Sequence, residues 1–135
     1  MLDKKEDMMY KAGIDVGSTT VKMVVFDDNY EMIFSRYERH FSDVKTATIK
    51  VLKDMITALG DVRFTFSITG SGGMGLSDVI GATFIQEVIA STLTIGKCIP
   101  PTDVMIELGG EDAKMTFFDG AMEQRMNGSC AGGTG

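Results

Sequence analysis

Residues 13–22 read Gly-Ile-Asp-Val-Gly-Ser-Thr-Thr-Val-Lys, and the rest of the chain is organised around this stretch. Apolar residues recur on both sides of it, which is typical of two β-strands joined by a hairpin. The turn contains only small residues, so a phosphate group can approach its backbone closely. Asp15, at the end of the first strand, is a candidate anchor for hydrated Mg²⁺ because that ion prefers carboxylate oxygens. The candidate phosphate ligands are Gly17, Ser18, Thr19 and Thr20.

The spacing of this turn differs from that of the common phosphate loops. A P-loop has a longer glycine-rich segment that ends in Gly-Lys-Ser/Thr before a helix, and a dinucleotide fingerprint has three spaced glycines before a helix. Here the apolar run at residues 21–26 predicts a strand instead. Taken alone, the stretch is equally compatible with an ordinary hairpin that has a Gly-Ser turn.

Composition and charge exclude some classes of partner. The 135 residues include 44% hydrophobic side chains and carry a net charge of −6, which is ordinary for a globular protein with a core. The acidic balance and the lack of a Lys/Arg cluster argue against nucleic acid as a partner. The N-terminus has no apolar signal segment and no later run is long enough to span a bilayer, so we expect no membrane association and a cytoplasmic location.

The rest of the chain predicts an alternation of strands and helices. The apolar residues of the first helix recur at helical spacing, with Ser42 or Asp43 as its N-cap and Gly60 just past its end. The lone His40 has no metal-ligand partner at a useful spacing and is predicted to lie at the surface. The glycine-rich loop is interpreted as a ligand contact or a flexible connection. The elements expected after the hairpin are a strand at 31–37, a helix at 44–59, a strand at 64–69, the loop at 70–75 and a helix at 84–97.

The two cysteines, Cys98 and Cys130, do not form a disulfide framework in a chain without an export signal. Cys98 follows an apolar helical pattern and is best explained as a buried or helix-end thiol. Cys130 lies instead in a segment of small residues, 127–135.

The opening hairpin occurs twice in the sequence. Residues 14–23 and 106–115 share one order of features: an apolar strand, an acidic residue, a glycine turn, a lysine and a second apolar strand. This duplication predicts two related lobes that each present a glycine turn to a phosphate chain. The corresponding pairs are Asp15 with Glu107, Gly17 with Gly109, and Lys22 with Lys114.

The repeat also predicts the domain organisation. We expect an N-terminal tail at residues 1–10, a first lobe at 11–101 and the start of a second lobe at 102–135. Few residues follow the second lobe's predicted strands, so we expect the chain to be a fragment in which this lobe is truncated. Those strands are predicted at residues 104–109, 113–118 and 121–126.

Several segments together resemble a known family. The two turns are similar to the first and second phosphate loops of the superfamily of actin, sugar kinases and heat-shock chaperone ATPases. The final Asn-x-x-Cys-Ala-x-Gly-Thr-Gly narrows the resemblance to the activases of 2-hydroxyacyl-CoA dehydratases, a group that includes the ATPase subunits of benzoyl-CoA reductases. The segments that carry it are residues 13–22, 69–70, 108–110 with Asp112 and Lys114, and 127–135.

The resemblance implies an α/β fold, with a ribonuclease H-like (actin-like ATPase) lobe of mixed sheet and flanking helices and the first strands of a second similar lobe. It also implies that the parent protein binds ATP between its lobes and hydrolyses it. In that family hydrolysis drives one electron from a 4Fe-4S cluster to a 2-hydroxyacyl-CoA dehydratase or a related acyl-CoA reductase, which is the expected partner.

The resemblance assigns roles to residues at matching positions of this sequence. Asp15 and Glu107 serve Mg²⁺, and Glu111 or Asp112 orients water, so that Asp15, Glu111 and Asp112 are the expected catalytic residues. Cys130 ligates a 4Fe-4S cluster shared between the two subunits of a homodimer, and no second cluster cysteine is present in its lobe. The other expected phosphate contacts and compensating charges are the turn at 17–20, Lys22, Gly109, Gly110 and Lys114.

Two positions depart from the family pattern, which often has Asp and Gln where this sequence has Glu107 and Glu111. A carboxylate at Glu111 adds negative charge near the γ-phosphate. Two alternatives stay open: a sugar or acyl kinase of the same superfamily, which has no use for Cys130, and a nucleotide-binding module without turnover.

Overall fold

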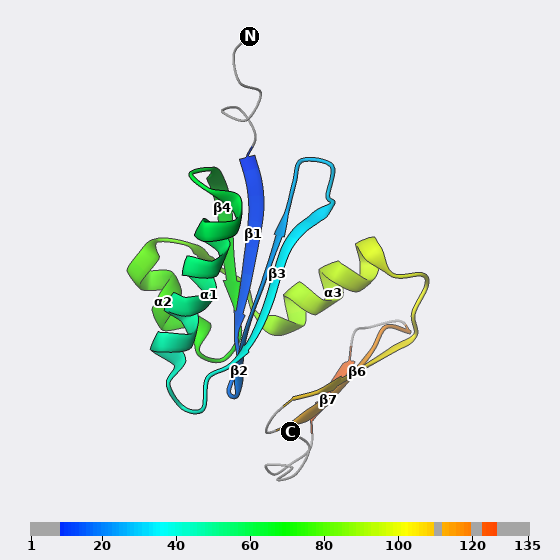
Figure 1. Cartoon of the computed structure of the whole chain (residues 1–135). Coiled ribbons are helices and arrows are strands. Elements are labelled where there is room, and N and C mark those ends of the chain that lie inside the picture. Colours follow the sequence, from blue (N-terminus) through cyan, green and yellow to red (C-terminus); the bar gives the residue numbers. More distant parts are fainter. Residues whose placement is uncertain (1–8, 110–111, 120–122, 127–135) are drawn as a thin grey trace. The chain divides into compact units, whose positions relative to one another are not determined.

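The computed structural model describes residues 9–109, 112–119 and 123–126, and the chain divides after residue 87 into two compact units. The first unit contains strands β1 (Met9–Val16), β2 (Thr20–Phe26), β3 (Met32–Arg39), β4 (Arg63–Thr69) and β5 (Thr83–Phe84). They form one sheet in the order β3-β2-β1-β4-β5 (Figure 1). Strands β1, β2 and β3 pair antiparallel, whereas β4 pairs parallel with both β1 and β5. The sheet is therefore mixed, as the sequence predicts.

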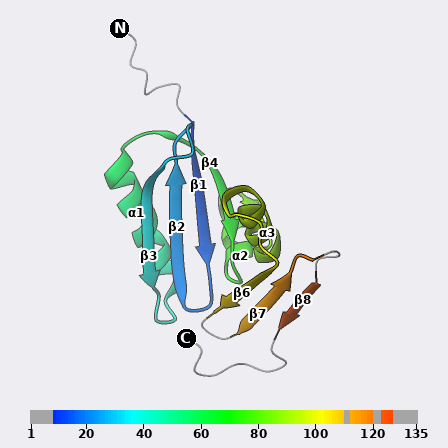
Figure 2. The ribbon, with the colours of Figure 1, turned by 90° about the vertical axis from the view of Figure 1, so that its right-hand side faces the viewer.

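Both helices of the first unit lie against the same face of this sheet (Figures 1 and 2). Helix α1 (Val44–Leu59) packs on β2 and β3, and helix α2 (Gly73–Ile80) packs on β4 and β5. Alternate side chains of each strand point toward the helices because successive residues of a strand face opposite sides. The predicted lobe of mixed sheet and flanking helices is confirmed. Its core consists of Ala12, Ile14, Val16, Val21, Met23, Val25, Phe34, Ala47, Val51, Met55 and Ile68.

Helix α1 follows the predicted boundaries at both ends. The Thr46 backbone N–H donates to Asp43 at 3.1 Å and caps the first turn, and the same hydrogen bond holds the pKa of the Asp43 carboxyl below its usual range. After the last turn, the Gly60 N–H donates to the Ile56 carbonyl. Gly60 has a φ of +77°, which glycine adopts readily because it has no Cβ.

The segment after β4 differs from the sequence prediction. A loop is predicted at residues 70–75, but α2 already begins at Gly73, since glycine's low helix propensity masks a helix start rich in glycine. The second predicted helix also starts later than residue 84. Residues 83–84 form β5, and the Ile85 N–H donates to the Ile68 carbonyl at 2.8 Å, which continues the sheet. Helix α3 (Glu87–Cys98) begins only beyond this bond.

The second unit contains most of α3 and an antiparallel sheet. Strands β6 (Val104–Leu108), β7 (Ala113–Phe117) and β8 (Glu123–Met126) pair in the order β6-β7-β8. The three strands predicted in this part of the chain are confirmed within the described residues, and residues 121–122 of the third prediction lie outside them. None of the described helices of either unit is long and apolar enough to cross a membrane.

The junction between β4 and α2 depends on one glycine. Gly70 has a φ of +96°, a conformation that disfavours residues with a Cβ. A Cβ at this position would lie 2.4 Å from the Val16 carbonyl oxygen and 2.5 Å from Asp15 Oδ1. The neighbouring Gly72 N–H donates to the same Val16 carbonyl at 2.8 Å. The junction is therefore packed directly against the end of β1.

Gly70→Ala is expected to lower the free energy of unfolding by about 2 kcal/mol or more, because the added Cβ meets backbone and the φ is unfavourable. Urea denaturation of wild type and variant measures this difference. The control is Gly75→Ala in α2, where a Cβ would have no heavy atom within 4 Å. Alanine there is expected to stabilise by up to about 1 kcal/mol through helix propensity. Equal stabilities of the two variants would contradict the tight junction.

Candidate functional site

Asp15 lies between two polar neighbours on adjacent strands. In the sheet register it pairs with Lys22 of β2 on one side and with Thr69 of β4 on the other. Lys22 Nζ is 2.9 Å from Asp15 Oδ2, and both side chains are partly exposed. Paired residues of neighbouring strands share one face of a sheet. The side chains of Lys22, Asp15 and Thr69 therefore form one row across the sheet, next to the turn that follows β1.

Two atoms in this row are buried without a hydrogen bond among the described residues: Asp15 Oδ1 and Thr69 Oγ1. A buried carboxylate oxygen without a donor is costly, and such atoms frequently mark a place where an ion, a water or a ligand belongs. Carboxylate oxygens are also the protein ligands that Mg²⁺ prefers. Asp15 therefore fits the predicted magnesium anchor, with Oδ2 on Lys22 and Oδ1 buried without a hydrogen bond among the described residues.

The turn after Asp15 is short and closed by one backbone bond. The Gly17 N–H donates to the Thr20 carbonyl at 2.9 Å, while Ser18 is exposed and Thr20 is buried. A Cβ at Gly17 would lie 3.4 Å from the Thr20 carbonyl oxygen, which is ordinary van der Waals contact. The structure thus places the predicted phosphate ligands together in one tight turn beside the Asp15 row.

His40 contacts this turn, and the sequence prediction of a surface position is wrong. The residue is 7% exposed, and its ring Nε2 lies 3.2 Å from the Gly17 carbonyl oxygen. Its backbone N–H donates to the Thr19 carbonyl at 3.1 Å. The prediction fails because both partners are backbone groups more than twenty residues earlier, and a sequence pattern carries no signal for such a contact.

The second hairpin reproduces the first in its register and its turn. Glu107 of β6 pairs with Lys114 of β7, as Asp15 pairs with Lys22. The Gly109 N–H donates to the Asp112 carbonyl at 2.8 Å, which matches the bond from Gly17 to Thr20 at equivalent positions of the repeat. A repeat recognised from residue types alone is therefore also a repeat of strand pairing and turn closure.

Of the two carboxylate oxygens of Glu107, one accepts a hydrogen bond and the other has none among the described residues. Ser91 Oγ of α3 donates to Glu107 Oε1 at 3.3 Å, whereas Oε2 is buried without a hydrogen bond among the described residues. The Ser91 contact was missed from the sequence because it joins a helix to a strand. Lys114 Nζ lies 3.8 Å from Asp112 Oδ2, so this lysine approaches the carboxylate of the turn.

Several predicted site residues lie outside the described part of the chain: Gly110, Glu111 and Cys130. Cys98, the other cysteine, was predicted as a buried or helix-end thiol; it lies at the end of α3 and is exposed, so the helix-end position is confirmed and burial is wrong. Across residues 9–109, 112–119 and 123–126, no group of three or more His, Cys, Asp or Glu side chains converges on a metal-ion site.

The turns and their acidic partners can be compared with those of characterised proteins. One relative, the 2-hydroxyisocaproyl-CoA dehydratase activator of Clostridioides difficile, is 30% identical over 133 residues, or 94% of this chain and 49% of the relative. A second, the activator of lactoyl-CoA dehydratase of Anaerotignum propionicum, is also 30% identical over 133 residues, with 94% and 50% covered. The chain thus spans about half the length of these relatives.

A solved structure and a family model agree with these relatives. The activator of the 2-hydroxyisocaproyl-CoA dehydratase from Clostridium difficile with bound ADPNP superposes with a TM-score of 0.76 and 28% identity, covering 88% of this chain and 46% of that one. The model of the BadF/BadG/BcrA/BcrD ATPase family matches residues 12–135, which is most of the sequence. The chain therefore belongs to the BadF/BadG/BcrA/BcrD ATPase family.

Proposed function

We propose that this chain supplies the N-terminal half of an ATP-dependent activator that passes one electron to a 2-hydroxyacyl-CoA dehydratase or a related acyl-CoA reductase. Family membership and the two dehydratase activators among its relatives support this assignment. The similar activator structure with bound ADPNP supports ATP as the nucleotide. The coverage of about half of each relative supports the assignment to one half of a longer protein.

The observation that carries the proposal is the pair of matched turns. Each has a glycine N–H bonded to the carbonyl three residues later and an acidic residue two positions before that glycine. Each acidic residue, Asp15 and Glu107, has one buried oxygen without a hydrogen bond among the described residues. Two turns of the same geometry suit a ligand with several phosphate groups.

In this proposal the acidic residues serve Mg²⁺ and the turns bind phosphate. Asp15 Oδ1 and Glu107 Oε2 would accept hydrogen bonds from the ion's water shell, because Mg²⁺ dehydrates reluctantly and keeps several waters. The bound ion would neutralise charge on the phosphates. The phosphate contacts assigned to the turns are Gly17, Ser18, Thr19, Thr20, Gly109 and Gly110.

The lysines and the remaining acidic residues have separate proposed roles. Lys22, held 2.9 Å from Asp15, and Lys114 would offset phosphate charge. Glu111 or Asp112 would orient the attacking water, as a carboxylate accepts a hydrogen bond from it.

Electron transfer is assigned to the C-terminal segment of the chain. Cys130 would ligate a 4Fe-4S cluster, which when bound supplies the single electron, and a cluster shared by two subunits would make the protein a homodimer. The acyl-CoA dehydratase or reductase component is the proposed electron acceptor. Nucleotide exchange would then bias a two-state change of shape, as it does in other nucleotide switches.

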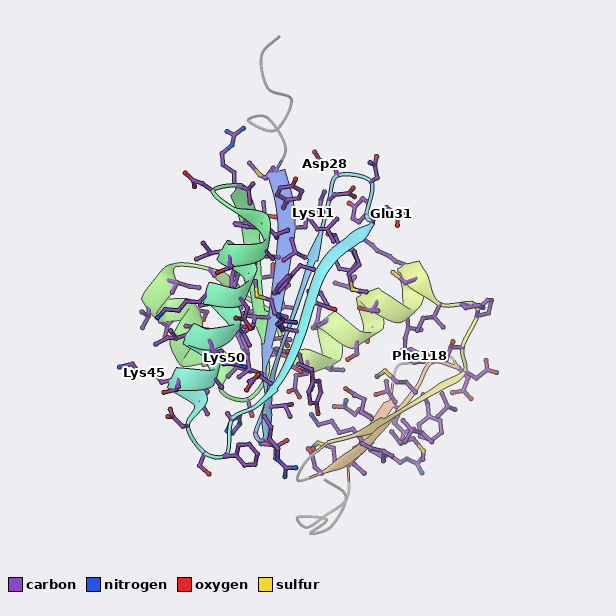
Figure 3. The ribbon with its side chains drawn as sticks, in the orientation of Figure 1. Lys11, Asp28, Glu31, Lys45, Lys50 and Phe118 are labelled. Carbon is purple, nitrogen blue, oxygen red and sulfur yellow. The ribbon has the colours of Figure 1, made fainter. Side chains whose placement is uncertain are left out.

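Asp15→Asn tests the magnesium role. In the full-length protein this change is expected to lower the rate of Mg-ATP hydrolysis about 100-fold, since the amide lacks the charge that holds the hydrated ion. The matched control is Asp28→Asn, because Asp28 Oδ1 also pairs with a lysine, Lys11 Nζ, at 3.5 Å. Figure 3 shows this pair where β1 begins, at the opposite end of the strand from Asp15. Equal loss of activity in both variants would contradict a specific role for Asp15.

Cys130→Ala separates an activator from a kinase of the same superfamily. We expect the variant to lose electron transfer to the dehydratase partner while it keeps Mg-ATP binding, because the cysteine serves the cluster and not the nucleotide. Anaerobic reconstitution with iron and sulfide, followed by absorbance and an electron-transfer assay, measures the loss. Full electron transfer by Cys130→Ala would overturn the cluster assignment.

A further inference from the structure

We propose that His40 is a positioning residue that sets the direction of the amide N–H groups in the turn at residues 17–20. This inference rests on the proposed function, since it assumes that the turn binds phosphate. It adds to that function a residue that lies outside both phosphate motifs. His40 contacts the turn through its ring and its backbone, and the residue is 7% exposed.

The hydrogen bonds of the ring define its tautomer. The Ser42 backbone N–H donates to His40 Nδ1 at 3.1 Å, so Nδ1 is an acceptor and carries no proton. In a neutral imidazole the proton must then be on Nε2, which lies 3.2 Å from the Gly17 carbonyl oxygen. His40 therefore donates its Nε2–H to Gly17. Both ring nitrogens are satisfied by backbone groups, one on each side.

The anchored carbonyls determine where the neighbouring amides point. The Gly17 carbonyl and the Ser18 N–H belong to one peptide group, and in a trans peptide these two bonds point in opposite directions. No cis peptide bond occurs among the described residues. The Ser18 N–H therefore points away from His40. The same holds for the Thr20 N–H, because the Thr19 carbonyl accepts the His40 backbone N–H at 3.1 Å.

A hydrogen bond to a carbonyl also polarises the N–H of the same peptide group. Chains of hydrogen bonds strengthen one another in this way in a medium of low dielectric constant. The Ser18 N–H thus becomes a better donor when Gly17 accepts from a buried His40. Both effects, direction and polarisation, favour binding of an anion on the side of the turn opposite to His40.

The backbone after His40 is strained in a way that supports this role. Phe41 has a φ of +46° and Ser42 a φ of +71°, in the left-handed region that residues other than glycine rarely adopt. This conformation turns the Ser42 N–H back onto the imidazole ring. The Asp43 N–H also donates to the His40 carbonyl at 2.7 Å, next to the cap of α1. Strain of this kind is kept where the surrounding structure holds it in place, and it clusters at functional sites.

Two substitutions of His40 separate positioning from packing. Glutamine carries an amide N–H at the ε position and can still donate to Gly17, whereas asparagine is shorter and can satisfy only the Ser42 N–H. We expect His40→Asn to raise KM for Mg-ATP about 10-fold with a smaller change in kcat, because a hydrogen bond to a charged group is weakened. His40→Gln is expected to stay within about threefold of wild type. The exposed Phe41→Ala serves as the control next to this site.

Nitrogen NMR of the histidine ring gives a test that needs no variant to be active. The ring signals absent from the His40→Gln spectrum belong to His40, and their shifts are expected to report a proton on Nε2 and none on Nδ1. A proton on Nδ1 would overturn the inference. Equal KM values for His40→Asn, His40→Gln and an active wild-type protein would overturn it as well. If the wild-type protein does not hydrolyse Mg-ATP, the proposed function itself fails and the inference with it.

Discussion

The backbone bond from a glycine N–H to the carbonyl three residues later is the constraint on which the rest depends. It closes the turn after β1 at Gly17 and the turn after β6 at Gly109, at 2.9 and 2.8 Å. In the second turn this closure leaves little space for a side chain, since a Cβ at Gly109 would lie 3.2 Å from the Asp112 carbonyl oxygen. Small turns of this kind leave backbone N–H groups accessible to an anion. The acidic residue two positions earlier is then fixed at the end of its strand.

The residues around the first turn hold its backbone in one conformation. Gly70 packs on the end of β1, where its φ and its contacts exclude a residue with a Cβ, and His40, the residue after β3, anchors the turn. Behind them, fully buried side chains such as Val21 and Val51 join the sheet to α1. A rigid turn matters for phosphate binding because donors that are already oriented need no rearrangement when the ligand arrives. Core packing therefore holds the turn in place, and the geometry of the turn sets the direction of the donors in the proposed phosphate site.

The sequence predicted those features whose cause is local or repeated. Helix α1 was predicted with both ends because its period, the Asp43 cap and Gly60 are local signals. The strands of the second hairpin were predicted because the repeat copies residue types at each position, and the structure adds that the two hairpins share one register. Helix α2 was missed since glycines occupy its start, and His40 was misplaced since its partners are backbone carbonyls on another hairpin. The orphaned oxygens of Asp15 and Glu107 could not be predicted either, because they depend on burial by elements distant in sequence.

The central proposal is that, in the full-length protein, the two turns bind the phosphates of one nucleotide. A crystal structure of the full-length protein with Mg²⁺ and a non-hydrolysable ATP analogue tests it most directly. The account predicts phosphate oxygens within hydrogen-bond distance of backbone amides in both turns, and the hydrated ion beside Asp15. A nucleotide whose phosphates contact neither turn, or only one of them, would contradict it.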